Sequence, residues 1–470
     1  DTHLSGDIVV SAPLELSGRA AQTTLVTQLS DHREMTRREA LDDLQYCASQ
    51  HRNDDDIRSA AKDRAGIRVS NVVPRKQTVQ QDLRALSLLT APSGAHIAGP
   101  EFDAFYENSG GYGYTWFRDE AECAKYLLAS DQLLDIDLES EYEEIVSFFI
   151  ETQLSDGTWA HRVWAIDGSL APGWANARLE GSDKPEYQAD QTASVITFLA
   201  RILTTRRESL TAEEQGHIER AIDDGVSGLN DSVGGDNLPE RCQNAWGNMV
   251  GQFTHTAATF LEAYAAVSQA PVESALQRHA TEQAKQLFDG ISQLWSESTG
   301  HYVMRLDDGD EDHRLDSSTL SLTTAFARYD EAVGLPTRAL SRLESHLRTT
   351  LTQLHRRSSD QSAGGLIRFE DDYWRSGDQH NEKVWSVSTA WGSTAAAEAA
   401  TIFESHDRAG VAAEFLSIAT ELYEYIQSDR TFSTEMGYLA EQAFDDGSLD
   451  SAAPLAWPHS LRLNATGLLA

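Results

Sequence analysis

The sequence predicts an all-helical (α/α)6 barrel, in which six helical hairpins close into a ring. Two observations predict it. From about residue 32 onward apolar residues recur at helical spacing, and the connections between helical segments alternate between short and long. Short connections force neighbouring helices to run antiparallel. A ring of such hairpins gathers every long connection at one end, where loops on a rigid scaffold commonly carry function.

Twelve helical segments follow residue 75. They are predicted at residues 76–91, 117–130, 137–154, 188–206, 212–229, 253–269, 272–297, 317–334, 336–356, 386–404, 407–428 and 457–469. The long connections between them are 92–116, 155–187, 230–252, 298–316, 357–385 and 429–456. An open helical solenoid has the same alternation, but solenoids usually show a sequence repeat of fixed period. No such repeat is visible here, so a closed ring is the prediction.

The N-terminal part differs from the rest. Residues 1–30 contain two stretches of strand character, 7–11 and 21–26, which Pro13 and Gly18 interrupt. Two strands are not stable alone. Residues 1–30 are therefore predicted to be a short β-segment, either a hairpin on the helical body or a remnant of a β-domain. We expect a helical linker at 31–75 and the barrel at 76–470.

The charge balance is strongly acidic: 74 acidic residues stand against 38 basic ones, for a net charge of −36. Such a carboxylate-rich, lysine-poor surface holds water and hydrated cations in brine, which predicts a halophile's protein; an ordinary acidic protein is the alternative. Acidity argues against nucleic acid and anionic membranes as partners. No apolar run is long enough to span a bilayer.

The number and spacing of the cysteines indicate the cellular compartment. Cys47, Cys123 and Cys242 are far apart, odd in number and without metal-ligand spacing. A disulfide framework is not expected, so a reducing, cytoplasmic location fits slightly better, with secretion left open. No metal or cofactor is predicted. The acidic string 307–313 has enough oxygens for a cation, but a solvated face is the preferred interpretation.

The long connections concentrate aromatic and charged residues. The first ends with Tyr114, Trp116 and the pair Arg118-Asp119. Guanidinium and carboxylate groups give directional hydrogen bonds to hydroxyls, and aromatic faces stack on the C–H side of a sugar ring. Asp119 alone is equally consistent with a helix cap, and any single Trp with a core residue. The whole string favours a sugar site.

Two glutamates lie in long connections that a closed barrel brings to one end. Glu240 is in the third and Glu441 in the sixth. Glycoside hydrolysis needs two carboxyl groups, one to protonate the leaving oxygen and one to activate water or attack directly.

Four strings resemble the glucoamylase and glucodextranase family, glycoside hydrolase family 15, and occur in that family's order. They are Trp116-Phe117-Arg118-Asp119, Gly365-Leu366-Ile367-Arg368-Phe369, Ala440-Glu441-Gln442 and Ala453-Pro454-Leu455-Ala456-Trp457. The resemblance runs from about residue 80 to the C-terminus and is of a halophilic archaeal type. It implies an (α/α)6 barrel and inverting release of β-glucose from non-reducing ends of α-glucans. It also implies that residues 1–30 are the end of an N-terminal β-sandwich, in this chain or as a separate partner.

The resemblance also implies roles for single residues. Glu441 is expected to be the general base. The residues expected to bind substrate are Tyr114, Trp116, Arg118, Asp119, Trp174, Asp190, Arg368, Trp385 and Trp457.

The general acid is where the sequence departs from the family. The family's string is Trp-Glu followed closely by Phe-Thr, whereas here Pro239 precedes Glu240 and extra residues separate it from Phe253-Thr254. Glu240 is the predicted acid, with Glu186 and Glu180 as substitutes. Losing the Trp removes apolar burial that would help raise the pKa of the acid. Dextran, trehalose and short maltooligosaccharides stay open as substrates. A catalytically inactive sugar-binding or regulatory homologue is the alternative from another class.

Overall fold

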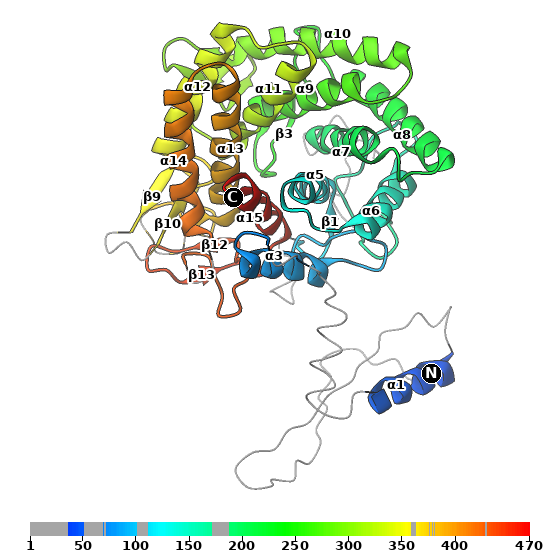
Figure 1. The fold of residues 1–470 in the computed structure, drawn as a ribbon. Coiled ribbons are helices and arrows are strands. Elements are labelled where there is room, and N and C mark those ends of the chain that lie inside the picture. Colours follow the sequence, from blue (N-terminus) through cyan, green and yellow to red (C-terminus); the bar gives the residue numbers. More distant parts are fainter. Residues whose placement is uncertain are drawn as a thin grey trace. The chain divides into compact units, whose positions relative to one another are not determined.

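Helices dominate the computed structural model, which describes residues 36–50, 69, 72–100, 111–171, 188–358, 363–375, 377, 379, 381–427 and 430–470 (Figure 1). The chain divides into two compact units, residues 1–66 and 67–470. In the first unit the described element is helix α1 (Arg37–Gln50), preceded by Thr36, whose hydroxyl accepts from the backbone N–H of Glu39 at 3.3 Å. The predicted β-segment at 1–30 lies outside the described residues and stays a prediction.

Six helices of the second unit form an inner ring, in which each contacts the next and the last returns to the first. They are α5 (Phe117–Leu134), α7 (Asp190–Arg206), α9 (Thr254–Gln269), α11 (Ser321–Ala332), α13 (Ser386–Ser405) and α15 (Ala456–Leu468). The outer helices are α3 (Lys76–Leu89), α6 (Glu139–Thr152), α8 (Ala212–Asn230), α10 (Ser274–Ile291), α12 (Thr337–Gln353) and α14 (Ala409–Tyr425). The predicted (α/α)6 barrel is confirmed.

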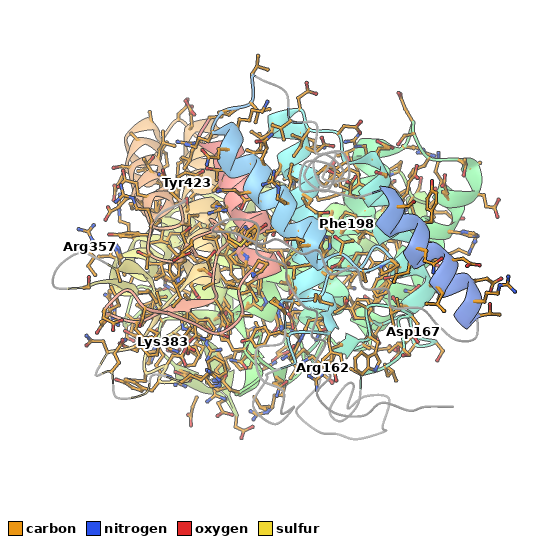
Figure 2. All side chains as sticks on the ribbon, turned by 90° about the horizontal axis from the view of Figure 1, so that it is seen from below. Arg162, Asp167, Phe198, Arg357, Lys383 and Tyr423 are labelled. Atoms are coloured by element: carbon orange, nitrogen blue, oxygen red, sulfur yellow. The ribbon has the colours of Figure 1, made fainter. Side chains whose placement is uncertain are left out.

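Burial explains why the two rings differ in sequence. Nearly every position of α13 is buried, and small residues let its neighbours approach. A Cβ atom at Gly392 would lie 2.5 Å from Leu366 Cδ1, so glycine is required for this packing. The outer helix α12 instead buries a single apolar stripe. Aromatic side chains pack between the two rings: Phe198 of α7, labelled in Figure 2, meets Phe149 of α6 edge-on, with ring centres 5.7 Å apart.

The predicted helix boundaries mostly agree with the structure, with two local differences. The helix predicted at 272–297 ends at Ile291, where a 3-10 turn, Ser292–Leu294, leads into strand β5 (Trp295–Ser296). The helix predicted at 317–334 begins with a 3-10 helix, Ser317–Leu320, which the side chain of Asp316 caps by accepting from Ser318 N–H. In both regions the apolar residues keep a helical spacing, but the backbone hydrogen bonds become those of a 3-10 helix. The spacing of apolar residues does not reveal this change.

Short antiparallel strands tie the long connections together. Strand β1 (Thr115–Trp116) pairs with β2 (Arg162–Val163), and β5 pairs with β6 (His301–Tyr302). β9 (His355–Arg357) pairs with β10 (Gly364–Leu366). A three-stranded sheet joins β11 (Val384–Trp385), β12 (Gln442–Ala443) and β13 (Leu449–Asp450). A four-stranded one joins β3 (Cys242–Gln243), β4 (Val250–Phe253), β7 (Arg305–Asp307) and β8 (Asp310–Asp312).

These strands decide where the inner helices begin. β1, β4 and β11 run directly into α5, α9 and α13. All inner helices therefore start at the same end of the barrel, and their N-termini, which carry partial positive charge, collect there. The long connections lie at this end, as the alternation of loop lengths predicts.

The acidic string at 307–313 forms the β7–β8 hairpin and its exit. Its carboxylates pair with arginines: Asp307 and Asp308 with Arg241, and Asp312 with Arg305 and Arg314. Within the described ranges no group of three or more His, Cys, Asp or Glu side chains is arranged to hold a metal ion. In the same residues no helix is both long and apolar enough to cross a bilayer.

Candidate functional site

A cavity of about 330 Å³ opens at the end of the barrel where the inner helices start. Three of its walls come from the first turns of α5, α13 and α15, and a fourth from the turn between β3 and β4. Its lining consists of Ala98, Tyr112, Trp116, Arg118, Asp119, Ala245, Trp246, Gly247, Asn248, Arg368, Trp374, Trp385, Val387, Glu441, Leu455 and Trp457.

Glu441 lies at the wall formed by β11, β12 and β13. Its backbone is fixed because Ser386 N–H donates to its carbonyl at 2.8 Å. Its side chain is 8% exposed, and Tyr112 Oη donates to Oε2 at 2.6 Å, with Ser451 Oγ donating to the same oxygen. Burial raises the pKa of Glu441, and the two hydroxyls oppose that shift, as do Arg368 and Lys383. The result is a carboxyl whose proton affinity is increased, as an acid–base catalyst requires.

Asp119 is the second carboxyl of the described lining. It lies in the first turn of α5, while the cap position is held by Trp116, whose side chain makes no capping hydrogen bond. The helix-cap alternative for Asp119 is therefore wrong. Burial raises the pKa of Asp119 to about 6, against the opposing charge of Arg118. Above that pH its carboxylate is available to accept hydrogen bonds from sugar hydroxyls.

Arg118 is held from behind the cavity wall. Its Nη1 donates to Gln188 Oε1 at 2.8 Å and to Asp190 Oδ2 at 3.2 Å. Asp190 is fully buried; burial by itself would raise the pKa of Asp190, but Arg118 and His255 outweigh it and lower the pKa. Asp190 does not line the cavity, so its predicted role as a direct substrate ligand becomes that of a buried partner of Arg118.

Arg368 and the aromatic residues form the remaining wall. Asp372 accepts from Arg368 Nε at 2.7 Å and from Nη2 at 2.9 Å, which fixes the plane of the guanidinium. That group lies 4.2 Å from the ring centre of Trp385 and 5.4 Å from that of Trp246. Charged donors, carboxyl acceptors and flat aromatic faces therefore surround one cavity, as sugar recognition requires.

Comparison with known proteins decides the family. The family model of glycosyl hydrolases family 15 matches residues 73–467. The chain belongs to glycosyl hydrolases family 15. No curated protein matches the chain significantly.

Solved structures agree with this assignment at the level of the fold. The glucoamylase from Saccharomycopsis fibuligera matches with a TM-score of 0.64 and 15% identity, over 85% of this chain and 97% of that one. A bacterial glucoamylase complexed with acarbose matches with a TM-score of 0.62 and 16% identity, over 92% of this chain and 61% of that one. A D-mannose isomerase also matches, with a TM-score of 0.56 and 11% identity, over 83% of this chain and 95% of that one. These likenesses show the fold and leave the reaction open.

Most of the predicted site residues of this family 15 protein meet at the cavity. Those that line it are Trp116, Arg118, Asp119, Arg368, Trp385, Glu441 and Trp457. Tyr114 does not: it is buried beneath Trp164, with the Arg162 guanidinium 4.9 Å from its ring centre. Trp174 lies outside the described residues, as do Glu180 and Glu186.

Glu240 does not reach the cavity. It is exposed and lies in a separate shallow depression with Arg241 and Gln252. The reason is local: Val233 pairs with Pro239, and Glu240 N–H donates to Ser232 O at 2.8 Å, which holds this stretch as a surface turn. The sequence predicted that Glu240 and Glu441 share one site, but the structure places Glu240 outside the cavity that Glu441 lines.

The β3–β4 turn supplies a wall that the predicted site did not include. Trp246, Gly247 and Asn248 all line the cavity. Trp246 Nε1 donates to Asp316 Oδ1 at 2.9 Å, and Asn244 Oδ1 accepts from Asn248 N–H at 3.0 Å. The sequence held a signal for it: Trp246 is the tryptophan that precedes Phe253-Thr254, and the residue after it is Gly247 rather than Glu.

Tyr112 and Trp374 also line the cavity without having been predicted to. Tyr112 is separated from Glu441 by most of the chain, and no local pattern distinguishes it from the neighbouring aromatics. Trp374 is 40% exposed and lies 5.8 Å from Trp385, ring centre to ring centre. It extends the aromatic wall toward solvent.

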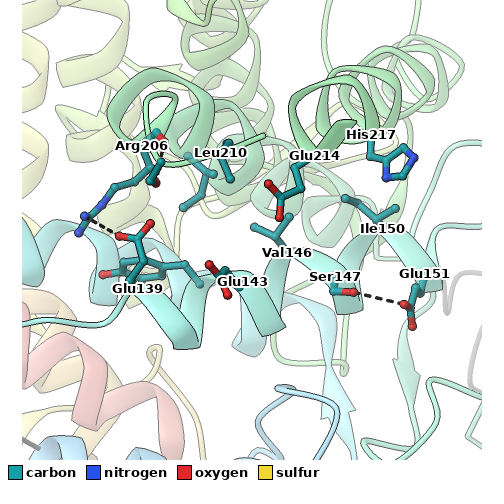
Figure 3. Close-up of a pocket in the computed structure, with 13 residues that line it drawn as sticks. Glu139, Glu143, Val146, Ser147, Ile150, Glu151, Arg206, Leu210, Glu214 and His217 are labelled. Carbon is teal, nitrogen blue, oxygen red and sulfur yellow. Dashed lines mark hydrogen bonds and ion pairs between the residues drawn. The ribbon is translucent and has the colours of Figure 1, made fainter. Parts of the chain in front are cut away.

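A second cavity, of about 360 Å³, lies between outer helices α6 and α8 (Figure 3). Its apolar floor includes Val146 and Ile150, and Glu139, Glu143 and Glu214 surround it. Arg206 Nη1 donates to Glu139 at 3.0 Å, shown as a dashed line in Figure 3. The cavity extends along α6 from Glu139 to Glu151, and it shares no lining residue with the cavity at Glu441. It has no role in the candidate site.

Proposed function

We propose that this family 15 protein is an inverting, exo-acting glycoside hydrolase that releases β-D-glucose from the non-reducing end of an α-glucan or maltooligosaccharide. The observation that carries the proposal is the setting of Glu441. It is a buried carboxyl at the cavity surface, held by two hydroxyl donors on one oxygen and close to Arg368.

The described donors to Glu441 all reach Oε2, including Gln442 Nε2 at 3.3 Å. Oε1 is then the oxygen that takes a proton from water as the water attacks the anomeric carbon. Inversion follows because the water attacks on the face opposite to the departing group. Arg118, Asp119 and Arg368 supply hydrogen bonds to the sugar hydroxyls, and Trp385 and Trp457 supply faces for stacking.

The test is Glu441→Gln, which keeps the shape of the side chain but removes its basicity. Hydrolysis should fall by at least roughly 100-fold on the wild-type protein's best substrate. The substrate panel is maltose, maltotriose, a dextran oligosaccharide and trehalose in molar salt, with the anomer of fresh glucose followed by NMR. Initial release of α-glucose, or near-normal turnover by the variant, would refute the proposal.

A second candidate is a protein that binds sugar without turnover. It is favoured by one observation: within the described lining, the carboxyls are Asp119 and Glu441, and Glu240 is elsewhere. Tight binding of acarbose with no release of glucose from any member of the panel or from α-D-glucosyl fluoride would select this candidate.

A further inference from the structure

We propose that Gly247 leaves the side of the cavity opposite Glu441 without a proton donor among the residues that the structure describes, so that the site favours α-glycosides whose leaving group departs as a stable anion. The proposal deepens the hydrolase function above and rests on it. In this proposal Gly247 determines which leaving groups the site accepts.

The order of the inner ring places Gly247 across the cavity from Glu441. Gly247 lies in the connection that leads into α9, and Glu441 in the connection that leads into α15. In the ring α5–α7–α9–α11–α13–α15, α9 and α15 are opposite members. Both residues line the same cavity, which therefore lies between them. Inverting hydrolysis uses two carboxyls on opposite sides of the scissile bond, roughly 6.5–9.5 Å apart. The wall that contains Gly247 is where the second one is needed.

In the described part of the chain, the residues of this wall, Trp246, Gly247 and Asn248, carry no carboxyl group. Trp246 directs its indole N–H to Asp316, which is buried and does not line the cavity. Asn248 exchanges hydrogen bonds with Asn244: Asn244 Nδ2 donates to Asn248 Oδ1 at 2.9 Å, and Asn248 N–H donates to Asn244 Oδ1 at 3.0 Å. The other described carboxyl, Asp119, is on α5, the ring neighbour of α15, and so lies on the Glu441 side.

The turn at Gly247 is rigid and has room for a side chain. Gln243 Nε2 donates to Gly247 O at 2.9 Å, and Gly247 N–H donates to Asn244 O at 3.0 Å. Gln188, which also binds Arg118, donates to Asn244 O at 2.9 Å, so the turn is coupled to the sugar-binding wall. A Cβ atom at Gly247 would meet nothing closer than Gln188 Nε2 at 3.8 Å. The first atom of a side chain at Gly247 would therefore make only ordinary van der Waals contacts, and the residue lines the cavity.

The chemistry separates two kinds of substrate. With α-D-glucosyl fluoride, water attacks C1 and gives its proton to Glu441, while fluoride leaves with the bonding electron pair of the C1–F bond and needs no proton. With maltose, the leaving oxygen must be protonated as the C1–O bond breaks, and a positioned acid contributes roughly 10²–10⁴-fold to the rate. A site with the base alone should process the fluoride and be slow on maltose.

The experiment compares wild type, Gly247→Glu and Gly247→Gln on these two substrates in molar salt. Gly247 has φ +76, so both variants carry the same backbone strain, and the Gln variant differs only in lacking the carboxyl. The wild type should favour the fluoride by at least roughly 100-fold in kcat/KM. Gly247→Glu should hydrolyse maltose faster than Gly247→Gln by a similar factor, whereas the two variants should act on the fluoride at similar rates.

The wild-type pH profile gives a second readout that does not depend on the variants folding. The groups that influence Glu441 are Tyr112, Asp119, Arg368 and Lys383. Without a catalytic acid, wild-type kcat/KM on the fluoride should rise as Glu441 ionises and then stay level. Gly247→Glu on maltose should gain a falling limb at higher pH, because its carboxyl must be protonated.

The outcomes separate the two proposals. If Glu441→Gln hydrolyses the fluoride normally, or if the wild type acts on neither substrate, the hydrolase function itself fails. If the wild type splits maltose about as efficiently as the fluoride with a bell-shaped profile, the role of Gly247 is overturned while the hydrolase function stands. Loss of that maltose activity in Glu186→Gln or Glu180→Gln would then identify the acid.

Discussion

Tyr112 Oη lies 2.6 Å from Glu441 Oε2 and donates to it, although 329 positions separate the two residues in the sequence. The contact joins the first long connection to the last, at the place where the ring of inner helices closes. Ser451, held at φ 72, donates to the same oxygen. The proposed catalytic base is therefore positioned by two segments that meet only when the barrel is complete.

Tyr112→Phe should shift the acidic limb of the pH profile upward. The hydrogen bond from Tyr112 stabilises the ionised carboxylate and lowers the pKa of Glu441, so its removal raises that pKa further. Less base is then ionised at any pH below the new value, and kcat/KM there should fall roughly 10-fold, with recovery at higher pH. The measurement is kcat/KM against pH for both proteins. An unchanged acidic limb would show that the contact does not tune Glu441.

Asp190→Asn should weaken sugar binding more than it slows turnover. Asp190 supplies the negative charge that holds Arg118 at the cavity wall, and Asn keeps the shape without the charge. Removing one partner of a buried ion pair typically costs about 3–5 kcal/mol of stability, so KM and the melting temperature are measured together. We expect KM to rise by about 10-fold or more, equivalent to about 1.4 kcal/mol.

The matched control for that variant is Asp167→Asn. Asp167 lies in an exposed loop, where its carboxylate accepts from Ser169. It should leave both KM and melting temperature unchanged. A folded Asp190→Asn protein with wild-type KM would mean that Gln188 alone positions Arg118.

Glu240→Gln should leave activity on every substrate within about two-fold of wild type. Glu240 is exposed in a depression that does not join the cavity, so its proton cannot reach a bound glycosidic oxygen. Glu240→Gln and Glu441→Gln are assayed in parallel, so that the effects of the same substitution are compared at the two positions. A large loss in the Glu240 variant would restore it as the general acid.

Low ionic strength should unfold the protein. A net charge of −36 repels itself across the surface, and the screening length grows from about 3 Å at 1 M salt to about 30 Å at 0.01 M. Far-UV circular dichroism during dialysis from molar salt should show loss of helix. NaCl and KCl at equal concentration should protect equally, since screening depends on ionic strength. A spectrum that does not change on dialysis would contradict a halophilic surface.

The sequence by itself determined the architecture. Helical periodicity and the alternation of loop lengths are local properties, and they predict twelve helices, their antiparallel pairing and the end at which the site lies. Arg118 and Asp119 could be predicted for a similar reason, because they lie in the first turn of α5 and their position follows from that helix. Glu441 lies in a long connection, and it was predicted from the string Ala440-Glu441-Gln442, which resembles the family's motif.

Only the tertiary structure decided which residues face the cavity. Glu240 and Gly247 belong to one connection and lie close together in sequence. The pairing of Val233 with Pro239 holds Glu240 at the surface, whereas the turn between β3 and β4 brings Gly247 to the cavity. Asp190 and Tyr114 were equally good candidates by residue type, but packing places them behind the wall. The physical reason is that loop orientation depends on hydrogen bonds between segments far apart in the chain, such as Tyr112 to Glu441 and Trp246 to Asp316. No local pattern encodes those partners, whereas a helix is encoded by its own residues.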